Sequence, residues 1–89
     1  HSNTQICVSA ERDFLAALHG GCAVPIAAYA ELRHEQLFLK GNIMSLDATQ
    51  KIEVEMQFNV DQAQQAGMLA AQEIRKRGAE EIIKTFRPS

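Results

Sequence analysis

The residue in this chain best suited to covalent chemistry is Cys22, which directly follows Gly20 and Gly21. A cysteine thiol becomes a soft nucleophile when it loses its proton, and surroundings that lower its pKa make it reactive. Glycine tolerates positive φ and lets a ligand approach the backbone, so the Gly-Gly-Cys sequence indicates an exposed turn. Taken alone, a cysteine in such a turn is also common as a small residue in a tight corner, and both interpretations stay open.

Three further side chains with reactive chemistry are interpreted more simply. Cys7 lies on an apolar helical stripe and is expected to be a buried small hydrophobe. His19 could lower the pKa of the Cys22 thiol, although a histidine at a helix end more often opposes the helix dipole, and His34 is expected to face solvent. Two reduced cysteines are favoured over a Cys7–Cys22 disulfide, which the sequence alone leaves open. These residues do not have the spacing of zinc ligands, so no metal site is expected.

The cations near the C-terminus are expected to be solvated. Arg75, Lys76 and Arg77 fall in the last turn of a predicted helix, where positive charge opposes the negative end of the helix dipole. The alternative is that this basic run faces a neighbouring domain.

The overall composition is that of an ordinary globular domain. The chain has 89 residues, a net charge of -2 and 46% hydrophobic residues, which argues against an intrinsically disordered chain. There is no broad basic surface for nucleic acid and no apolar run of the ~20 residues that a membrane span needs, so neither partner is expected. Two reduced cysteines are typical of a cytosolic protein, and a cytoplasmic location is predicted. Residues 1–3 are interpreted as the remnant of an expression tag, and residues 4–89 as one domain.

The hydrophobic periodicity predicts an α+β fold. Apolar residues recur every three or four positions near the N-terminus, and they alternate with polar residues in three later segments. Asp61 is predicted to be a helix N-cap, and Gly78 is predicted to end the helix that follows. The expected structure is a three-stranded antiparallel sheet with about three helices packed on one face, in the order α-β-β-β-α-α. The predicted helices cover residues 4–18, 61–77 and 79–86, and the predicted strands cover residues 24–32, 36–45 and 51–58.

A longer pattern around Cys22 resembles the signature of the porphobilinogen deaminases, also called hydroxymethylbilane synthases. The matching residues are Glu11, Arg12, Phe14, Leu18, Gly20, Gly21, Cys22, Val24, Pro25, Ile26 and Ala27. The predicted order of elements is similar to that of the third, C-terminal domain of this family, so the resemblance covers essentially the whole chain. One departure lies between the second and third strands, where Asp47 is followed by Ala48 and family members often have Asp-Gly.

The resemblance implies a transferase of tetrapyrrole and heme biosynthesis. The family joins four porphobilinogen units into hydroxymethylbilane with release of ammonia, and builds the growing oligopyrrole on a covalently attached dipyrromethane. By this resemblance, Cys22 holds the dipyrromethane through a thioether, and Gly20 and Gly21 let the anchored pyrrole lie against the loop. Cys22 is then an anchor formed once, since the thioether is stable.

The same resemblance implies that this chain lacks part of the enzyme. The family's catalytic aspartate and its carboxylate-binding arginines lie in two preceding domains, which are the expected partners of this one. We therefore expect no catalytic residue here, no activity of the isolated domain and a free Cys22 thiol without dipyrromethane. The competing hypothesis is a stand-alone α+β interaction module in which the Gly-Gly-Cys turn is coincidental.

Overall fold

A computed structural model describes residues 3–19, 25–45 and 48–86 of the chain. Gly20, Gly21 and Cys22 lie outside the described residues. In chain order the elements are helix α1 (Asn3–His19), strands β1 (Ile26–Arg33), β2 (Gln36–Met44) and β3 (Lys51–Asn59), a 3-10 turn η1 (Val60–Gln62), helix α2 (Ala63–Ile74), a π-helical turn η2 (Arg75–Ala79) and helix α3 (Glu80–Phe86).

The three strands form one antiparallel sheet in the order β1-β2-β3, which confirms the predicted meander. The hairpin between β1 and β2 closes through His34 and Glu35, between the paired residues Arg33 and Gln36. Both turn residues have positive φ, at 49° and 64°, as a two-residue turn requires if it is to follow the right-handed twist of the strands. His34 is exposed, as predicted.

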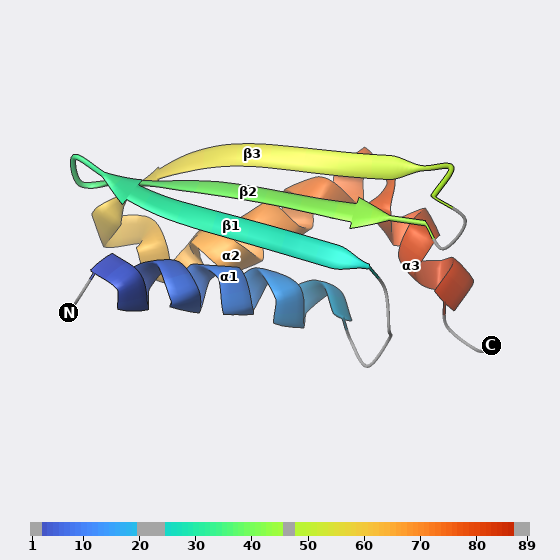
Figure 1. The fold of residues 1–89 in the computed structure, drawn as a ribbon, viewed down its shortest axis with the longest axis horizontal. Coiled ribbons are helices and arrows are strands. Elements are labelled where there is room, and N and C mark those ends of the chain that lie inside the picture. The colour runs from blue at the N-terminus through green and yellow to red at the C-terminus, as the bar shows by residue number, and fades with distance from the viewer. Residues whose placement is uncertain (1–2, 20–24, 46–47, 87–89) are drawn as a thin grey trace.

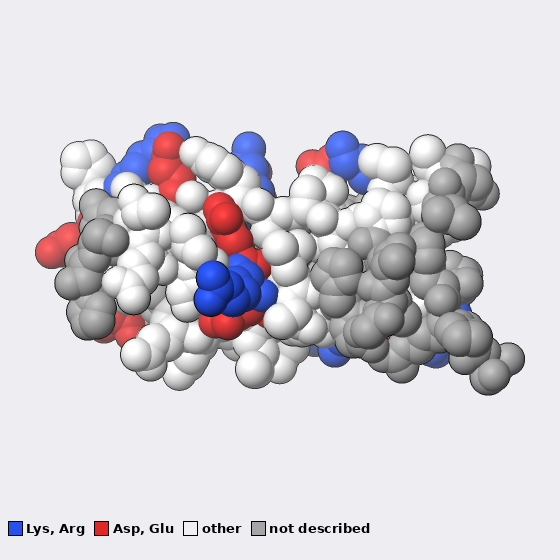
Figure 2. All heavy atoms as spheres, turned by 60° about the horizontal axis from the view of Figure 1, so that its bottom comes forward, with Lys and Arg blue, Asp and Glu red and all other residues white. Residues whose placement is uncertain are grey.

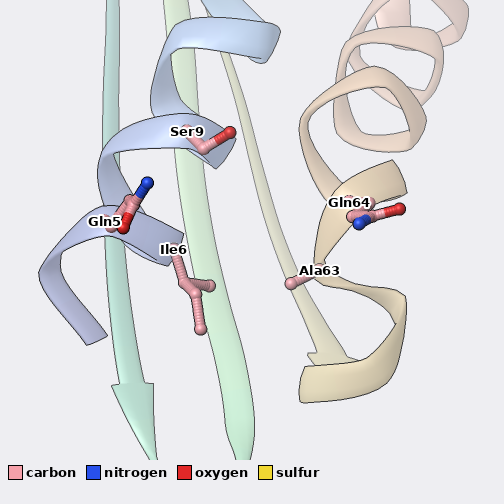
Figure 3. Close-up of a pocket in the computed structure, with 5 residues that line it drawn as sticks. All are labelled: Gln5, Ile6, Ser9, Ala63 and Gln64. Atoms are coloured by element: carbon pink, nitrogen blue, oxygen red, sulfur yellow. The ribbon is translucent and has the colours of Figure 1, made fainter. Parts of the chain in front are cut away.

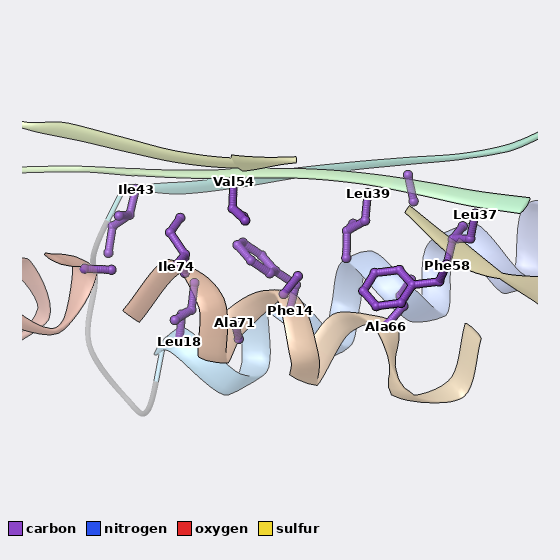
Figure 4. Close-up of a cluster of buried hydrophobic side chains, with 14 of the residues drawn as sticks. Phe14, Leu18, Leu37, Leu39, Ile43, Val54, Phe58, Ala66, Ala71 and Ile74 are labelled. Carbon is purple, nitrogen blue, oxygen red and sulfur yellow. The ribbon is translucent and has the colours of Figure 1, made fainter. Parts of the chain in front are cut away.

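The molecule has two layers, with the sheet on one side and all the helices on the other (Figure 1). The alternation in β3 produces this division, because Val54 and Phe58 are buried while Glu53 and Glu55 are exposed. Figure 4 shows the buried side chains meeting between the two layers. The largest fully buried side chains are Phe14, Leu18, Leu37, Leu39, Ile43, Ile74 and Ile82.

Two glycines allow α1 to lie close to its neighbours. A Cβ on Gly41 of β2 would overlap the ring of Phe14, so this glycine makes room for the aromatic side chain against the sheet. A Cβ on Gly67 of α2 would lie 2.5 Å from the Ala10 carbonyl oxygen and 2.7 Å from the Phe14 backbone nitrogen. Helix α1 therefore packs closely on two sides, through the Phe14 ring against β2 and through its backbone against α2.

Two sequence predictions need correction in the region after β3. Asp61 is not a helix N-cap: it lies inside η1, and neither η1 nor α2 has a side-chain hydrogen bond at its N-cap. The reason is that the chain leaves β3 through a tight 3-10 turn, whose Val60 N–H donates to the Glu35 carbonyl at 2.9 Å. Gly78 does interrupt the helix, with φ at 123°, but α2, η2 and α3 follow one another without a loop. If α2, η2 and α3 are counted as one bent segment, the sheet is covered by two helical segments, this one and α1, where three helices were predicted.

Candidate functional site

The candidate site is the connection between α1 and β1, the segment that contains Cys22. Its flanks are well defined: α1 ends at His19 and β1 begins at Ile26. The Pro25 carbonyl accepts a hydrogen bond from the Met44 N–H at 3.0 Å, which ties the start of β1 to the end of β2. The predicted site residues Gly20, Gly21 and Cys22 lie outside the described residues, whereas α1 and β1, the elements on either side of them, are described.

A carboxylate joins these two flanking elements. The Ala30 N–H of β1 donates to Oε2 of Glu11 at 2.7 Å, in a partly buried contact. Since β1 pairs only with β2, it is an edge strand whose outward N–H groups need partners outside the sheet. Glu11, a residue of the signature, is half-buried and fixes α1 against β1.

An arginine from the far end of the chain holds the last turn of α1. Nη2 of Arg75 donates to the Ala17 carbonyl at 2.5 Å, and Nε of Arg75 lies 3.5 Å from Oε2 of Glu80. Carbonyls in the last helical turn have no partner within the helix, so an arginine there satisfies an otherwise open acceptor. The prediction that Arg75 is simply solvated is wrong, because the fold brings η2 beside the end of α1.

Arg77, in the same predicted basic run, also has specific partners. Its Nε donates to Oε2 of Glu73 at 3.1 Å, and its Nη1 donates to the Glu53 carbonyl at 3.1 Å. This contact joins η2 to β3 and does not involve α1 or β1. Glu73 is a local partner, four residues before Arg77, whereas the Glu53 carbonyl is a backbone atom that the fold brings close.

The second cysteine is poorly suited to act as a nucleophile. Cys7 is a free thiol that packs against the edge of the core. It is half-buried, whereas the sequence predicted a buried side chain. Burial raises the pKa of the Cys7 thiol above its ordinary value of 9.0, and the carboxylates of Glu11 and Glu31 raise it further, against a hydrogen bond with the Leu32 backbone that lowers it. At neutral pH Cys7 is therefore overwhelmingly in the unreactive thiol form.

The charges on the helical face do not form a basic surface. Figure 2 shows acidic and basic side chains adjoining in the middle of this face and again along its upper edge, with uncharged residues between these groups. Arg12 is exposed, and the ion pairs among the described residues do not include it. In the described part of the chain, no three His, Cys, Asp or Glu side chains are grouped to hold a metal ion, and no helix is long and apolar enough to cross a membrane.

A hollow that no sequence pattern predicted lies between the first turns of α1 and α2. It has a volume of about 240 Å³ and is lined by Gln5, Ile6, Ser9, Ala63 and Gln64. Figure 3 shows the hydroxyl and amide groups at its rim. No charged group and no thiol lines it, and it adjoins the opposite end of α1 from the Cys22 segment.

Comparison with known proteins decides the family. The family model described as "Porphobilinogen deaminase, C-terminal domain" matches residues 5–76. The chain belongs to this family. The match spans the whole segment from Glu11 to Ala27 and also includes Arg75, so the chain is not an unrelated module in which the Gly-Gly-Cys sequence is coincidental.

Relatives named porphobilinogen deaminase agree with this assignment. The protein of Carboxydothermus hydrogenoformans is 37% identical over 87 residues, covering 98% of this chain and 28% of the relative. That of Chlorobium limicola is 41% identical over 91 residues, covering 98% and 29%. That of Cytophaga hutchinsonii is 42% identical over 80 residues, covering 90% and 26%. The chain thus spans less than a third of the length of the curated relatives that it matches.

Proposed function

We propose that this chain is the cofactor-carrying domain of a hydroxymethylbilane synthase and that Cys22 Sγ is the attachment atom. The observation that carries the proposal is the family match over the signature around Cys22, combined with the length of the relatives. The full-length protein would be a cytoplasmic transferase that joins four porphobilinogen units into hydroxymethylbilane, and the two preceding domains would be its partners in the same chain.

The properties of the two thiols support Cys22 as the anchor. The raised pKa of Cys7 and its place against the core make it a poor nucleophile. Cys22 lies in a glycine-rich connection between two fixed elements, where a bulky pyrrole can approach the backbone. When porphobilinogen loses ammonia, its C–N bond breaks and leaves an electrophilic methylene carbon. The Cys22 thiol then forms the C–S bond and loses its proton, which balances the step as a substitution of thiol for amine.

The bound dipyrromethane would supply the terminal pyrrole carbon to which the first new unit is added, and each later unit would add to the pyrrole before it. The residues of this chain hold that primer in place: α1 and β1 carry the two ends of the attachment loop, and Glu11 and Arg75 fix α1 on either side. Each pyrrole carries two carboxylates, and their recognition needs a set of cations. The net charge of -2 and the mixed charges of this domain do not provide one, so we expect catalysis to require the other domains.

Intact mass spectrometry of the full-length protein tests the proposal. We expect a covalent dipyrromethane on the wild type, its loss in Cys22→Ser and its retention in the matched control Cys7→Ser. An unmodified wild type with normal synthase activity would contradict the role of Cys22. For the 89-residue chain alone we expect a free thiol and no turnover of porphobilinogen, and measurable turnover would overturn the expected inertness.

A further inference from the structure

We propose that Glu11 is a positioning residue for the Cys22 loop, with Arg75 as a second anchor of the same helix. The inference rests on the proposed attachment of dipyrromethane to Cys22. Neither side chain is assigned a contact with substrate: each acts by holding the helix that delivers the loop.

The first step is the position of the Glu11 contact. Its hydrogen bond with the Ala30 N–H, at 2.7 Å, joins the two elements that the loop connects. Residues 12–19 between Glu11 and the loop are helical, and residues 26–29 between the loop and Ala30 are extended. Both segments are held by regular backbone hydrogen bonds, so the separation of α1 and β1 sets the distance that the connecting residues must span.

The second step is the strength and direction of this contact. An ionised carboxylate that accepts a backbone N–H makes a shorter and stronger hydrogen bond than a neutral acceptor. The contact is partly buried, so water competes for it less than at an exposed site. It also blocks part of the open edge of β1, where a free N–H would otherwise face outward.

The third step is the anchor at the other side of α1. Arg75 binds the Ala17 carbonyl in the last turn of the helix and is itself within ion-pair distance of Glu80. Ala17 is three residues before Gly20, so this contact fixes the point from which the loop departs. The Glu11 contact determines the distance between α1 and β1, and the Arg75 contact determines where the end of α1 lies against η2.

The chain contains a matched pair of residues that should lack this role. Glu73 and Arg77 are the same residue types, bind each other and, through the Glu53 carbonyl, join η2 to β3. Among the described residues, their hydrogen bonds and ion pairs involve neither α1 nor β1. Their removal costs polar contacts of the same kind without loosening the elements that flank the loop.

The test is the rate at which full-length apo-protein acquires its Cys22 adduct when mixed with porphobilinogen, followed by intact mass and normalised to the folded fraction. Misplacing reacting groups by about 1 Å can cost on the order of 100-fold in rate, so we expect Glu11→Ala to slow loading by at least about tenfold. Glu11→Gln should recover most of the rate, because its amide oxygen still accepts from Ala30. Arg75→Ala should slow loading, while Glu73→Ala and Arg77→Ala should stay within about twofold of the wild type.

A purely structural role would lower the free energy of unfolding without changing the rate per folded molecule. Loading of folded Glu11→Ala at the wild-type rate would therefore overturn the inference, as would equal slowing by the Glu73 and Arg77 controls. If Glu11→Ala does not fold, the comparison of Arg75→Ala with Arg77→Ala decides in the same way. A wild type that never acquires an adduct on Cys22 would refute the proposed function itself, which is a different outcome from normal loading by every variant.

Discussion

The close contact between α1 and α2 predicts that Gly67→Ala destabilises the domain, although alanine is the better helix former. Alanine in a helix interior is favoured over glycine by about 1 kcal/mol. Here, however, the new Cβ would lie 2.5 Å from the Ala10 carbonyl oxygen, 2.6 Å from the Asp13 Cβ and 2.7 Å from the Phe14 backbone nitrogen. None of these atoms can turn away by changing a rotamer, so the whole of α1 must move.

The expected magnitude follows from these two opposing effects. Overpacking of a close interface costs about 1–3 kcal/mol, and a clash with backbone belongs at the upper end. Subtracting about 1 kcal/mol for helix propensity leaves a net loss of about 2 kcal/mol. For a domain of this size, that loss corresponds to a decrease in Tm of about 8–16 °C.

Urea and thermal unfolding followed by circular dichroism measure this loss. The matched control is Gln65→Ala, an exposed position on the same helix, which should change the free energy of unfolding by less than about 0.5 kcal/mol. A Gly67→Ala variant as stable as the wild type would refute the conclusion that backbone contact fixes the separation of the two helices.

Three further predictions concern other parts of the domain. Ala48 has φ at 60°, a left-handed conformation that costs a residue with a Cβ about 1–2 kcal/mol, so Ala48→Gly should stabilise the fold by about 0.5–1 kcal/mol in urea unfolding; a destabilised variant would contradict this. Phe14 is fully buried, so Phe14→Ala should lose about 3–5 kcal/mol in the same measurement, and a loss below about 1 kcal/mol would show that the core closes around the cavity. Because the pKa of Cys7 is raised in the folded state, the unfolded thiol ionises first, and the wild type should lose stability relative to Cys7→Ala as pH rises above 9.0. A stability difference between wild type and Cys7→Ala that does not change from pH 7 to pH 10.5 would rule out that shift.

The sheet and its order were predictable because their signals are local. The alternation of Ile52, Val54 and Met56 with charged residues indicates a strand with one buried face wherever the strand lies in the fold. Gly78 likewise ends a helix through its own backbone freedom. The N-cap assigned to Asp61 was wrong because the geometry of the chain leaving β3, and not side-chain preference, determines how this turn is made.

The contacts that position the candidate site were not predictable, although one of their residues belongs to the recognised signature. The sequence identifies Glu11 as a signature residue, but its partner is a backbone N–H of a strand edge, which carries no side-chain signal. Arg75 was assigned to solvent because its partner is a carbonyl of α1, brought close only by tertiary packing. The type of chemistry at Cys22 follows from its residue type and its surroundings in sequence, whereas the alignment of the loop depends on these long-range contacts.

The central claim is that Cys22, and not Cys7, carries the dipyrromethane. Trypsin separates the two cysteines, because it cleaves after Arg12 and Arg33 and so places Cys7 in the peptide that ends at Arg12 and Cys22 in residues 13–33. Tandem mass spectrometry of digested full-length protein should find the dipyrromethane on Cys22 in the peptide of residues 13–33, and none on the peptide that ends at Arg12. A dipyrromethane on Cys7, or an active protein in which both peptides are unmodified, would contradict the account.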